Sequence, residues 1–234
     1  MSMIPDICTM YILLAAATPF EIKPALDFLT KSPSRPLHLE VQQLITGIGS
    51  LSAAWSLMHH IGHRRPELVI QAGIAGCFTG KKPGEVVVVK EEILADLGVW
   101  EGGRFKDIFD LNLAAKDGFP FSNRLLINPY DHLLNFSGLD SVRSITINEI
   151  TTDQNRIAWY QQNINPVVES MEGGALHYVC LQENIPFLQV RSISNYIGER
   201  DKTKWNIPAA LHNLNEQVIA ILKSLDGCDR TILQ

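Results

Sequence analysis

Two polar residues, Glu172 and Asn195, each follow a short apolar segment in the second half of the chain. Glu172 lies in ESMEGGA at 169–175, and Asn195 ends VRSISN at 190–195. We expect a strand to end at each position, and parallel sheets bind ligands outside the carboxyl ends of their strands. A carboxylate and a carboxamide brought together at such an edge would suit a ribose diol beside a purine.

A further carboxylate, Glu21, follows the first apolar segment, in AAATPFE at 15–21. A glutamate in the first turn of a helix usually compensates the helix dipole at the surface. That interpretation stays open for Glu21 alone, because only its combination with other polar groups would indicate catalysis.

The elements that must position these residues alternate along the chain. Runs of β-branched and aliphatic residues predict buried strands at 9–16, 39–46, 67–72, 85–90, 141–147 and 187–192. Helices are expected at 20–29, 50–62, 173–183 and from Pro208 onward. The alternation predicts an α/β fold: one domain over 1–234, with a central mixed, mostly parallel sheet flanked by helices on both faces.

Segment 98–129 breaks this alternation. It is rich in Gly, Asp, Asn and Phe and shows no periodicity. Long irregular segments in compact domains are often functional, so we expect a rim or lid here.

The composition limits the class of partner. Apolar residues make up 46%, enough for a sizeable core, and the formal net charge is -5. No global field would recruit nucleic acid or anionic lipid, so we expect a small-molecule partner, no nucleic acid and no membrane.

The apolar run at 11–17 is too short to span a bilayer. The widely spaced Cys8, Cys77, Cys180 and Cys228 predict no disulfide framework and fit a cytoplasmic location.

Two glycine-rich turns follow expected strands. GIGSLS at 47–52 lacks the third glycine of a dinucleotide fingerprint and any P-loop lysine. It is either a tight turn capped by Ser50 or a set of backbone amides that face a ligand. QAGIAGC at 71–77 carries small residues that let main chain approach a flat ring, so we favour a base-binding role there over packing alone.

Histidines do not indicate a metal site. His59, His60 and His63 crowd a stretch that Gly62 and the following basic residues mark as a helix end. His177 fits a core or interface position. We expect neither a metal nor a cofactor.

Taken together, these segments resemble the nucleoside phosphorylase and nucleosidase superfamily over essentially the whole chain. The matching segments are AATPFE at 16–21, TGIG at 46–49, PELVIQAGIAG at 66–76, GEVVVV at 84–89, SME at 170–172 and ISN at 193–195. Within it, the chain is most similar to the futalosine hydrolases, through ADLG at 95–98, PFLQVR at 186–191, SNYIGERD at 194–201 and WNIPAALHNL at 205–214.

The resemblance implies roles for individual residues. Cleaving an N-ribosidic bond builds positive charge on the sugar and negative charge on the departing purine. Glu21 matches the family's water-activating glutamate. Glu172 matches the glutamate that binds the ribose hydroxyls, and Met171 would pack under the ribose ring. The substrate-binding set is completed by Ile74, Ala75, Gly76 and Thr151.

Asn195 departs from the adenine-specific nucleosidases of this family, which have aspartate facing the purine N7. A carboxamide can donate to O6 of a 6-oxopurine and accept from a protonated N7, whereas a carboxylate only accepts. We therefore predict a catalytic Asn195 and a hypoxanthine-type base. The expected reaction is hydrolysis of futalosine to hypoxanthine and dehypoxanthine futalosine, a step of menaquinone biosynthesis.

Three alternative functions stay open. A methylthioadenosine/S-adenosylhomocysteine-type nucleosidase would share the fold but favour adenine. A purine nucleoside phosphorylase would need cationic groups for phosphate, and the turn around Thr18 offers no arginine. A non-catalytic purine nucleoside-binding protein would not need Glu21 beside Glu172.

The group beyond the sugar is less defined. A 5′ aromatic carboxylate would need an apolar slot and a cation. Candidates for the slot are Trp100, Phe105 and Phe109; candidates for the cation are Arg104, Lys106 and Arg200. The resemblance also implies a homo-oligomer, with a dimer favoured.

Overall fold

An eight-stranded mixed sheet forms the centre of the protein, whose computed structural model describes residues 9–78 and 80–234. Its strands are β1 (Met10–Ala16), β2 (Leu39–Ile45), β3 (Leu68–Cys77), β4 (Val86–Leu94), β7 (Leu126–Ile127), β8 (Asp140–Thr146), β9 (Val168–Ser170) and β10 (Phe187–Tyr196). The order is β10-β4-β8-β9-β3-β1-β2; β7 pairs with β4, and β10 also pairs with β3. The last pairing closes β3, β10, β4, β8 and β9 into a ring, from which β1 and β2 extend as an open sheet.

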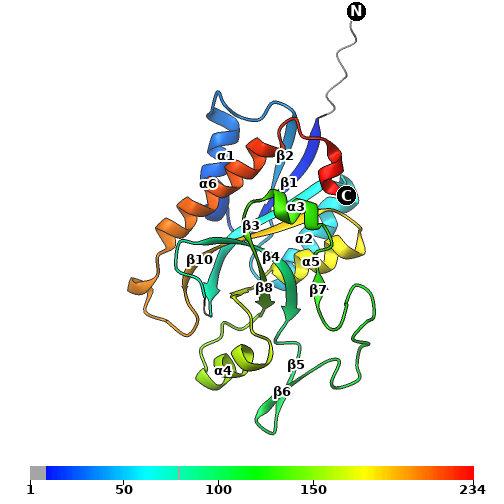
Figure 1. The fold of residues 1–234 in the computed structure, drawn as a ribbon, viewed down its shortest axis with the longest axis vertical. Coiled ribbons are helices and arrows are strands. Elements are labelled where there is room, and N and C mark those ends of the chain that lie inside the picture. The colour runs from blue at the N-terminus through cyan, green and yellow to red at the C-terminus, as the bar shows by residue number, and fades with distance from the viewer. Residues whose placement is uncertain (1–8, 79) are drawn as a thin grey trace, which may run out of the picture.

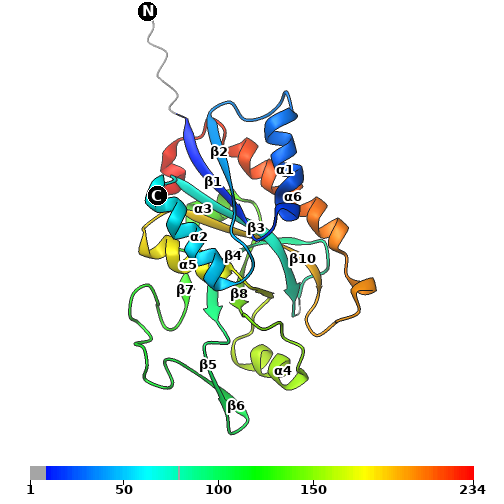
Figure 2. The same ribbon diagram turned by 180° about the vertical axis from the view of Figure 1, so that it is seen from behind.

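Helices cover both faces of this sheet (Figures 1 and 2). Helices α1 (Pro19–Lys31) and α6 (Ile207–Leu225) pack together on one face, and α2 (Ser50–His63) and α5 (Gly173–Gln182) on the other. The shorter elements are α3 (Asp131–Phe136), α4 (Gln154–Asn163) and the 3₁₀ turns η1 (Lys202–Lys204) and η2 (Arg230–Leu233). Of these, α3 and η2 pack against the same core as α1 and α6.

Strand β1 shows why both faces must be covered. All of its residues are buried, and successive side chains of a strand point to opposite faces. Ile12 and Leu14 pack into a core with Leu214 and Val218 of α6. Leu13 packs into a second core beneath α2 and α5. A strand that is apolar at every position therefore requires helices on both sides.

Most predicted elements are present, and the α/β fold with a mixed sheet is confirmed. The prediction for 71–77 as a turn is wrong, because β3 continues to Cys77 and pairs there with Tyr196 of β10. For the first glycine turn, the interpretation in which Ser50 caps the helix does not hold, because the N-cap is Gly49. Helices α3 and α4 were not predicted, whereas β9 is the strand that was expected to end before Glu172. The expectation for Cys8 lies outside the described residues.

Segment 98–129 is less irregular than its composition indicated. It contains the antiparallel pair β5 (Gly98–Glu101) and β6 (Arg104–Asp107) and ends in β7. Trp100 and Phe105 pack against Trp159 of α4. Figure 1 shows this hairpin at the end of the molecule opposite the N-terminal strand.

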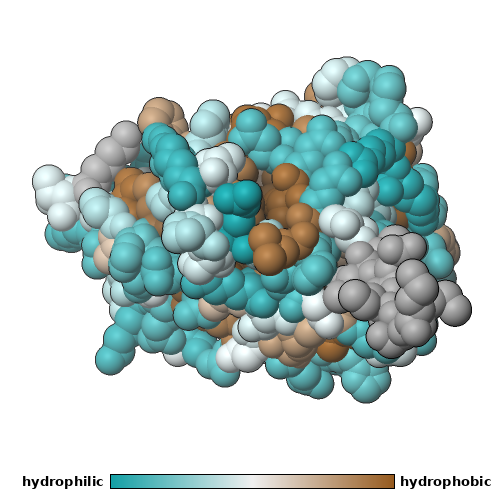
Figure 3. Space-filling model, turned by 90° about the horizontal axis from the view of Figure 1, so that it is seen from above, coloured by the Kyte–Doolittle hydropathy of each residue, from teal (hydrophilic) through white to brown (hydrophobic). Residues whose placement is uncertain are grey.

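The described helices were compared in length and apolar character with what a membrane span requires. In the described part of the chain, no helix combines the length and apolar character needed to cross a membrane. Seen from above relative to Figure 1, hydrophilic residues predominate and hydrophobic ones form separate patches (Figure 3).

Candidate active site

A cavity of about 360 Å³ opens where β1, β3, β9 and β10 end. All of the predicted site residues line it: Glu21, Ile74, Ala75, Gly76, Thr151, Met171, Glu172 and Asn195. The volume falls within the range of small-molecule sites. Residues from four separate strand ends and two helix starts thus meet around one space.

Glu21 belongs to the first turn of α1 and turns back toward the sheet. Its Oε2 accepts hydrogen bonds from the backbone N–H of Thr18 at 3.0 Å and from the Thr18 hydroxyl at 3.2 Å. Its Oε1 accepts from the backbone N–H of Ile74 at 3.2 Å. The side chain is therefore fixed between α1 and β3 rather than extended into solvent.

Several groups act on the acidity of Glu21. Burial raises the pKa of its carboxyl above the ordinary value, and the charge of Glu172 adds to the rise. The guanidinium of Arg191 and the two backbone donors hold the pKa of Glu21 down. A carboxylate held in this balance can accept a proton from water near neutral pH.

Glu172 is the N-cap residue of α5 and is only 7% exposed. Its Oε1 accepts a hydrogen bond from the backbone N–H of Gly49 at 2.9 Å. Next to this contact, the Ser50 hydroxyl donates to the carbonyl of Met171 at 3.2 Å. The backbone amide of the first glycine turn thus binds the protein's own carboxylate and orients it toward the cavity.

Asn195 lies near the end of β10, after a shift of register between Ile193 and Asn195. Its Nδ2 donates to the carbonyl of Tyr196 at 2.9 Å, and its Oδ1 accepts from the Ser194 hydroxyl at 2.7 Å. The carbonyl partner fixes which end of the amide is the donor. One amide hydrogen and one oxygen lone pair remain for a ligand.

The glycines of β3 allow close packing inside the sheet. A Cβ on Gly73 would lie 2.3 Å from the Arg191 guanidinium and 2.9 Å from Glu21 Oε1. A Cβ on Gly76 would lie 2.2 Å from the Ile197 side chain. The small residues at 71–77 therefore serve packing around the site, in addition to any contact with a ligand.

Sequence reasoning missed Arg191 and Glu169. Arg191 is 2% exposed and donates to Gln71 Oε1 at 2.5 Å. Glu169 is 6% exposed and lines the cavity. Charged residues inside apolar strand segments are rarely buried without a partner, and this signal was visible in both segments.

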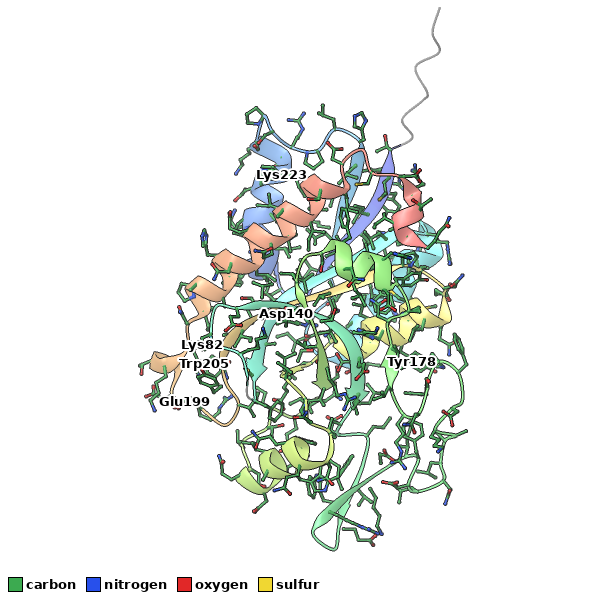
Figure 4. All side chains as sticks on the ribbon, in the orientation of Figure 1. Lys82, Asp140, Tyr178, Glu199, Trp205 and Lys223 are labelled. Carbon is green, nitrogen blue, oxygen red and sulfur yellow. The ribbon has the colours of Figure 1, made fainter. Side chains whose placement is uncertain are left out.

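The predicted slot for a 5′ group lies elsewhere. Trp100, Phe105, Phe109, Arg104 and Lys106 do not line the cavity, because the β5–β6 hairpin packs on α4. Arg200 does line it, together with Trp205 from the segment that leads into α6 and with Ile207 and Leu211 from the first turns of α6. Figure 4 shows Trp205 close to Glu199 on this segment.

Within residues 9–78 and 80–234, no group of three or more His, Cys, Asp or Glu side chains could hold a metal ion. The chemistry available in the cavity includes the carboxylates of Glu21, Glu169 and Glu172, the carboxamide of Asn195 and backbone amides. This set can activate water, bind a diol and hydrogen-bond a heterocycle.

Comparison with known proteins identifies the family and the fold. The model of the phosphorylase superfamily matches residues 39–225. A futalosine hydrolase of Thermus thermophilus is 29% identical over 198 residues, covering 80% of this chain and 83% of that protein. A 5′-methylthioadenosine/S-adenosylhomocysteine nucleosidase of Bacillus cytotoxicus is 28% identical, covering 80% and 82%. Among solved structures, the corresponding nucleosidase of Colwellia psychrerythraea in complex with adenine has a TM-score of 0.77 at 20% identity, covering 94% of this chain and 98% of that one.

Proposed function

This chain belongs to the phosphorylase superfamily, and on that premise we propose that it is a nucleosidase that hydrolyses the N-ribosidic bond of a 6-oxopurine nucleoside. Futalosine is the favoured substrate, with hypoxanthine as the base that leaves. The proposal rests on one observation: Glu21, Glu172 and Asn195 all line the same cavity.

Each group has a defined task in this reaction. Glu21 takes a proton from the attacking water, whose oxygen bonds to the anomeric carbon as the bond to the purine nitrogen breaks. Glu172 accepts hydrogen bonds from the ribose hydroxyls, and its negative charge favours the cationic sugar of the transition state. Asn195 donates a hydrogen bond to O6 of the departing base and accepts one from N7, which takes its proton from water so that the purine leaves as the neutral base.

Two contacts favour water over phosphate as the nucleophile. The backbone N–H of Ile74 binds Glu21, and the backbone N–H of Gly49 binds Glu172. Backbone amides near helix and strand ends are common phosphate ligands, but here both are occupied by carboxylates. A phosphate placed between them would be repelled by two negative charges.

The side chains at the far end of the cavity suit the substrate that the similarity to futalosine hydrolases implies. Arg200 lies over the Trp205 ring at 5.6 Å, beside Ile207 and Leu211. This is a cation next to an apolar surface, which suits a 5′ aromatic carboxylate. Replacing Arg200 with alanine should raise KM for futalosine and leave KM for inosine unchanged.

Base preference depends on Asn195. Leaving one buried polar group unpaired costs about 1–3 kcal/mol. We therefore expect Asn195→Asp to shift the ratio of kcat/KM for inosine over adenosine by roughly tenfold to a hundredfold toward adenosine. An unchanged ratio would refute the assignment of Asn195.

The homo-oligomer stays a prediction. Apolar side chains are exposed on α2, where Leu51 is 86% and Trp55 is 66% exposed, and such patches often mark protein contacts. Sedimentation velocity on the purified chain measures the state, with a dimer expected.

The function is tested by incubating the protein with futalosine, inosine, adenosine and methylthioadenosine in phosphate-free buffer. We expect free hypoxanthine from futalosine, at a rate that added phosphate does not raise. Adenine released faster than hypoxanthine would indicate the adenine-specific nucleosidase. Binding without release of any base would indicate a nucleoside-binding protein.

A further inference from the structure

Helix α5 begins directly after Glu172 with two glycines, Gly173 and Gly174. Glycine loses more backbone freedom on folding than any other residue, so this helix start depends on bonds from other groups. An N-cap residue usually supplies such a bond by accepting from the second or third N–H of the helix. Within the described part of the chain, the Glu172 side chain accepts from neither of them and bonds the N–H of Gly49 instead.

Thr146, the last residue of β8, supplies the missing cap. Its Oγ1 accepts a hydrogen bond from the backbone N–H of Gly174, the second of α5, at 2.7 Å. A hydroxyl carries one hydrogen, and Thr146 donates it to Glu92 Oε1 at 3.0 Å. The buried hydroxyl is therefore fixed in direction, with a lone pair toward the start of α5.

Both glycines are required by the close packing of this helix start. A Cβ on Gly173 would lie 2.2 Å from Gln189 Nε2. A Cβ on Gly174 would lie 2.3 Å from Leu94 Cδ2 and 3.3 Å from Thr146 Oγ1. A larger residue at either position would push α5 away from the sheet, and so away from the hydroxyl that caps it.

The end of β8 also holds the strand that leads into Glu172. Thr146 pairs with Ser170 of β9, and the N–H of Ile147 donates to the Ser170 carbonyl at 3.1 Å. The backbone is thus held by β8 both before and after Glu172. Because Thr146 caps the helix, the Glu172 carboxylate can bond Gly49 and face the cavity.

We propose that Thr146 is a positioning residue, which caps α5 so that the carboxylate of Glu172 is available to the ribose hydroxyls. Thr146 lies outside the cavity lining and acts on the substrate only through Glu172. The proposal rests on the proposed function for the role of Glu172, and it adds the group that holds this carboxylate in place.

The test measures binding by calorimetry with ligands that are not turned over. 9-Deazainosine carries its ribose on a carbon–carbon bond that hydrolysis does not cleave, and 9-deazahypoxanthine is the corresponding free base. Wild type should bind the nucleoside roughly tenfold more tightly than the base. Thr146→Val keeps the shape of the side chain without its hydroxyl; it should lower this ratio roughly fivefold and leave the affinity for the base unchanged.

Two further variants separate the cap from a general effect on the fold. Thr146→Ser keeps the hydroxyl and should keep the wild-type ratio. Ser144→Ala is the matched control, because Ser144 is a buried hydroxyl on the same strand that bonds the Ile145 carbonyl rather than α5. It should change neither affinity.

A Thr146→Val protein that keeps the wild-type ratio overturns the role of Thr146, and so does an equal loss of affinity for nucleoside and base. If Thr146→Val does not fold, hydrogen exchange at the ¹⁵N-labelled amide of Gly174 in wild type decides. Slow exchange there supports the cap, and exchange as fast as at Gly102, which is exposed in the β5–β6 turn, overturns it.

The remaining outcomes distinguish this proposal from the proposed function. Wild type that binds the nucleoside no more tightly than the base overturns the role of Thr146 together with that of Glu172. If the ratios change as expected but futalosine is not hydrolysed, the role of Thr146 stands and the proposed hydrolysis is wrong.

Discussion

Glu21 and Glu92 belong to two polar regions that differ in access to solvent. Glu92 lies on β4 and is 0% exposed; it accepts hydrogen bonds from Thr146 Oγ1 and Gln189 Nε2, both at 3.0 Å. Burial raises the pKa of Glu92 to about 7. Glu21 also has a raised pKa, but its carboxyl lines the cavity.

Arg191 lies between the two regions and lowers the pKa of both Glu21 and Glu92. The Glu92 region extends to the start of α5, where Thr146 Oγ1 accepts from the backbone N–H of Gly174 at 2.7 Å. A perturbed pKa therefore does not by itself distinguish a catalytic carboxylate from a structural one. What distinguishes Glu21 is that a substrate can reach it.

The largest effect in this comparison is expected from Glu21→Gln. Loss of the general base should lower kcat by roughly 10²–10⁴-fold, because the amide cannot take a proton from water. Steady-state hydrolysis of futalosine measures this, with Glu92→Gln as the matched variant. A Glu21→Gln protein that keeps its kcat would remove Glu21 from the mechanism.

The pH dependence of wild type follows from the same carboxyl. The base must be ionised, so kcat/KM should fall as the pH drops through the pKa of Glu21. Because burial raises that pKa, the acidic limb should lie above the ordinary glutamate value of about 4.3. A kcat/KM that stays constant below that value would contradict the assignment.

Glu92→Gln should act on stability instead. The pKa of Glu92 in the folded protein is raised from 4.5 to about 7, because burial favours the neutral carboxyl. Its contribution to the free energy of unfolding is therefore fully present below pH 4.5 and is lost as the pH rises through 7. The loss corresponds to about 3 kcal/mol of unfolding free energy. Urea unfolding at pH 4.5 and 8 should therefore show that the free energy of unfolding of Glu92→Gln, relative to that of wild type, is higher at pH 8 than at pH 4.5. Parallel pH profiles for the two proteins would show that Glu92 is not buried as described.

The smallest effect is expected from Ser50→Ala. It removes the hydroxyl that bonds the Met171 carbonyl, a contact that contributes about 1 kcal/mol. KM should rise several-fold with kcat nearly unchanged, because the loss falls on substrate positioning. If kcat falls instead, the contact serves the transition state.

The sequence predicted the residues that line the cavity better than the elements around them. Glu21, Glu172 and Asn195 could be found because each polar residue follows an apolar segment, and strand ends share one edge of a parallel sheet. Arg191 and Glu169 could not be assigned a partner from the sequence, since each bonds to a distant segment, namely Gln71 for Arg191 and Thr151 for Glu169.

The closure of β3, β10, β4, β8 and β9 into a ring could not be predicted from the sequence either. Strand β10 pairs in parallel with β3 and antiparallel with β4, and no local pattern distinguishes the two. Segment 98–129 was misjudged for a related reason: its Trp100 and Phe105 pack on Trp159 of α4, and sequence composition does not reveal which distant helix covers a loop. Both errors concern partners far apart in the chain.

The most direct test of the account follows the oxygen that reaches the sugar. The protein is incubated with futalosine in ¹⁸O-labelled water that contains unlabelled phosphate, and both products are analysed by mass spectrometry. We predict free hypoxanthine and a sugar product that carries one ¹⁸O at its anomeric carbon. A sugar 1-phosphate, or intact futalosine after prolonged incubation, would contradict hydrolysis at this cavity.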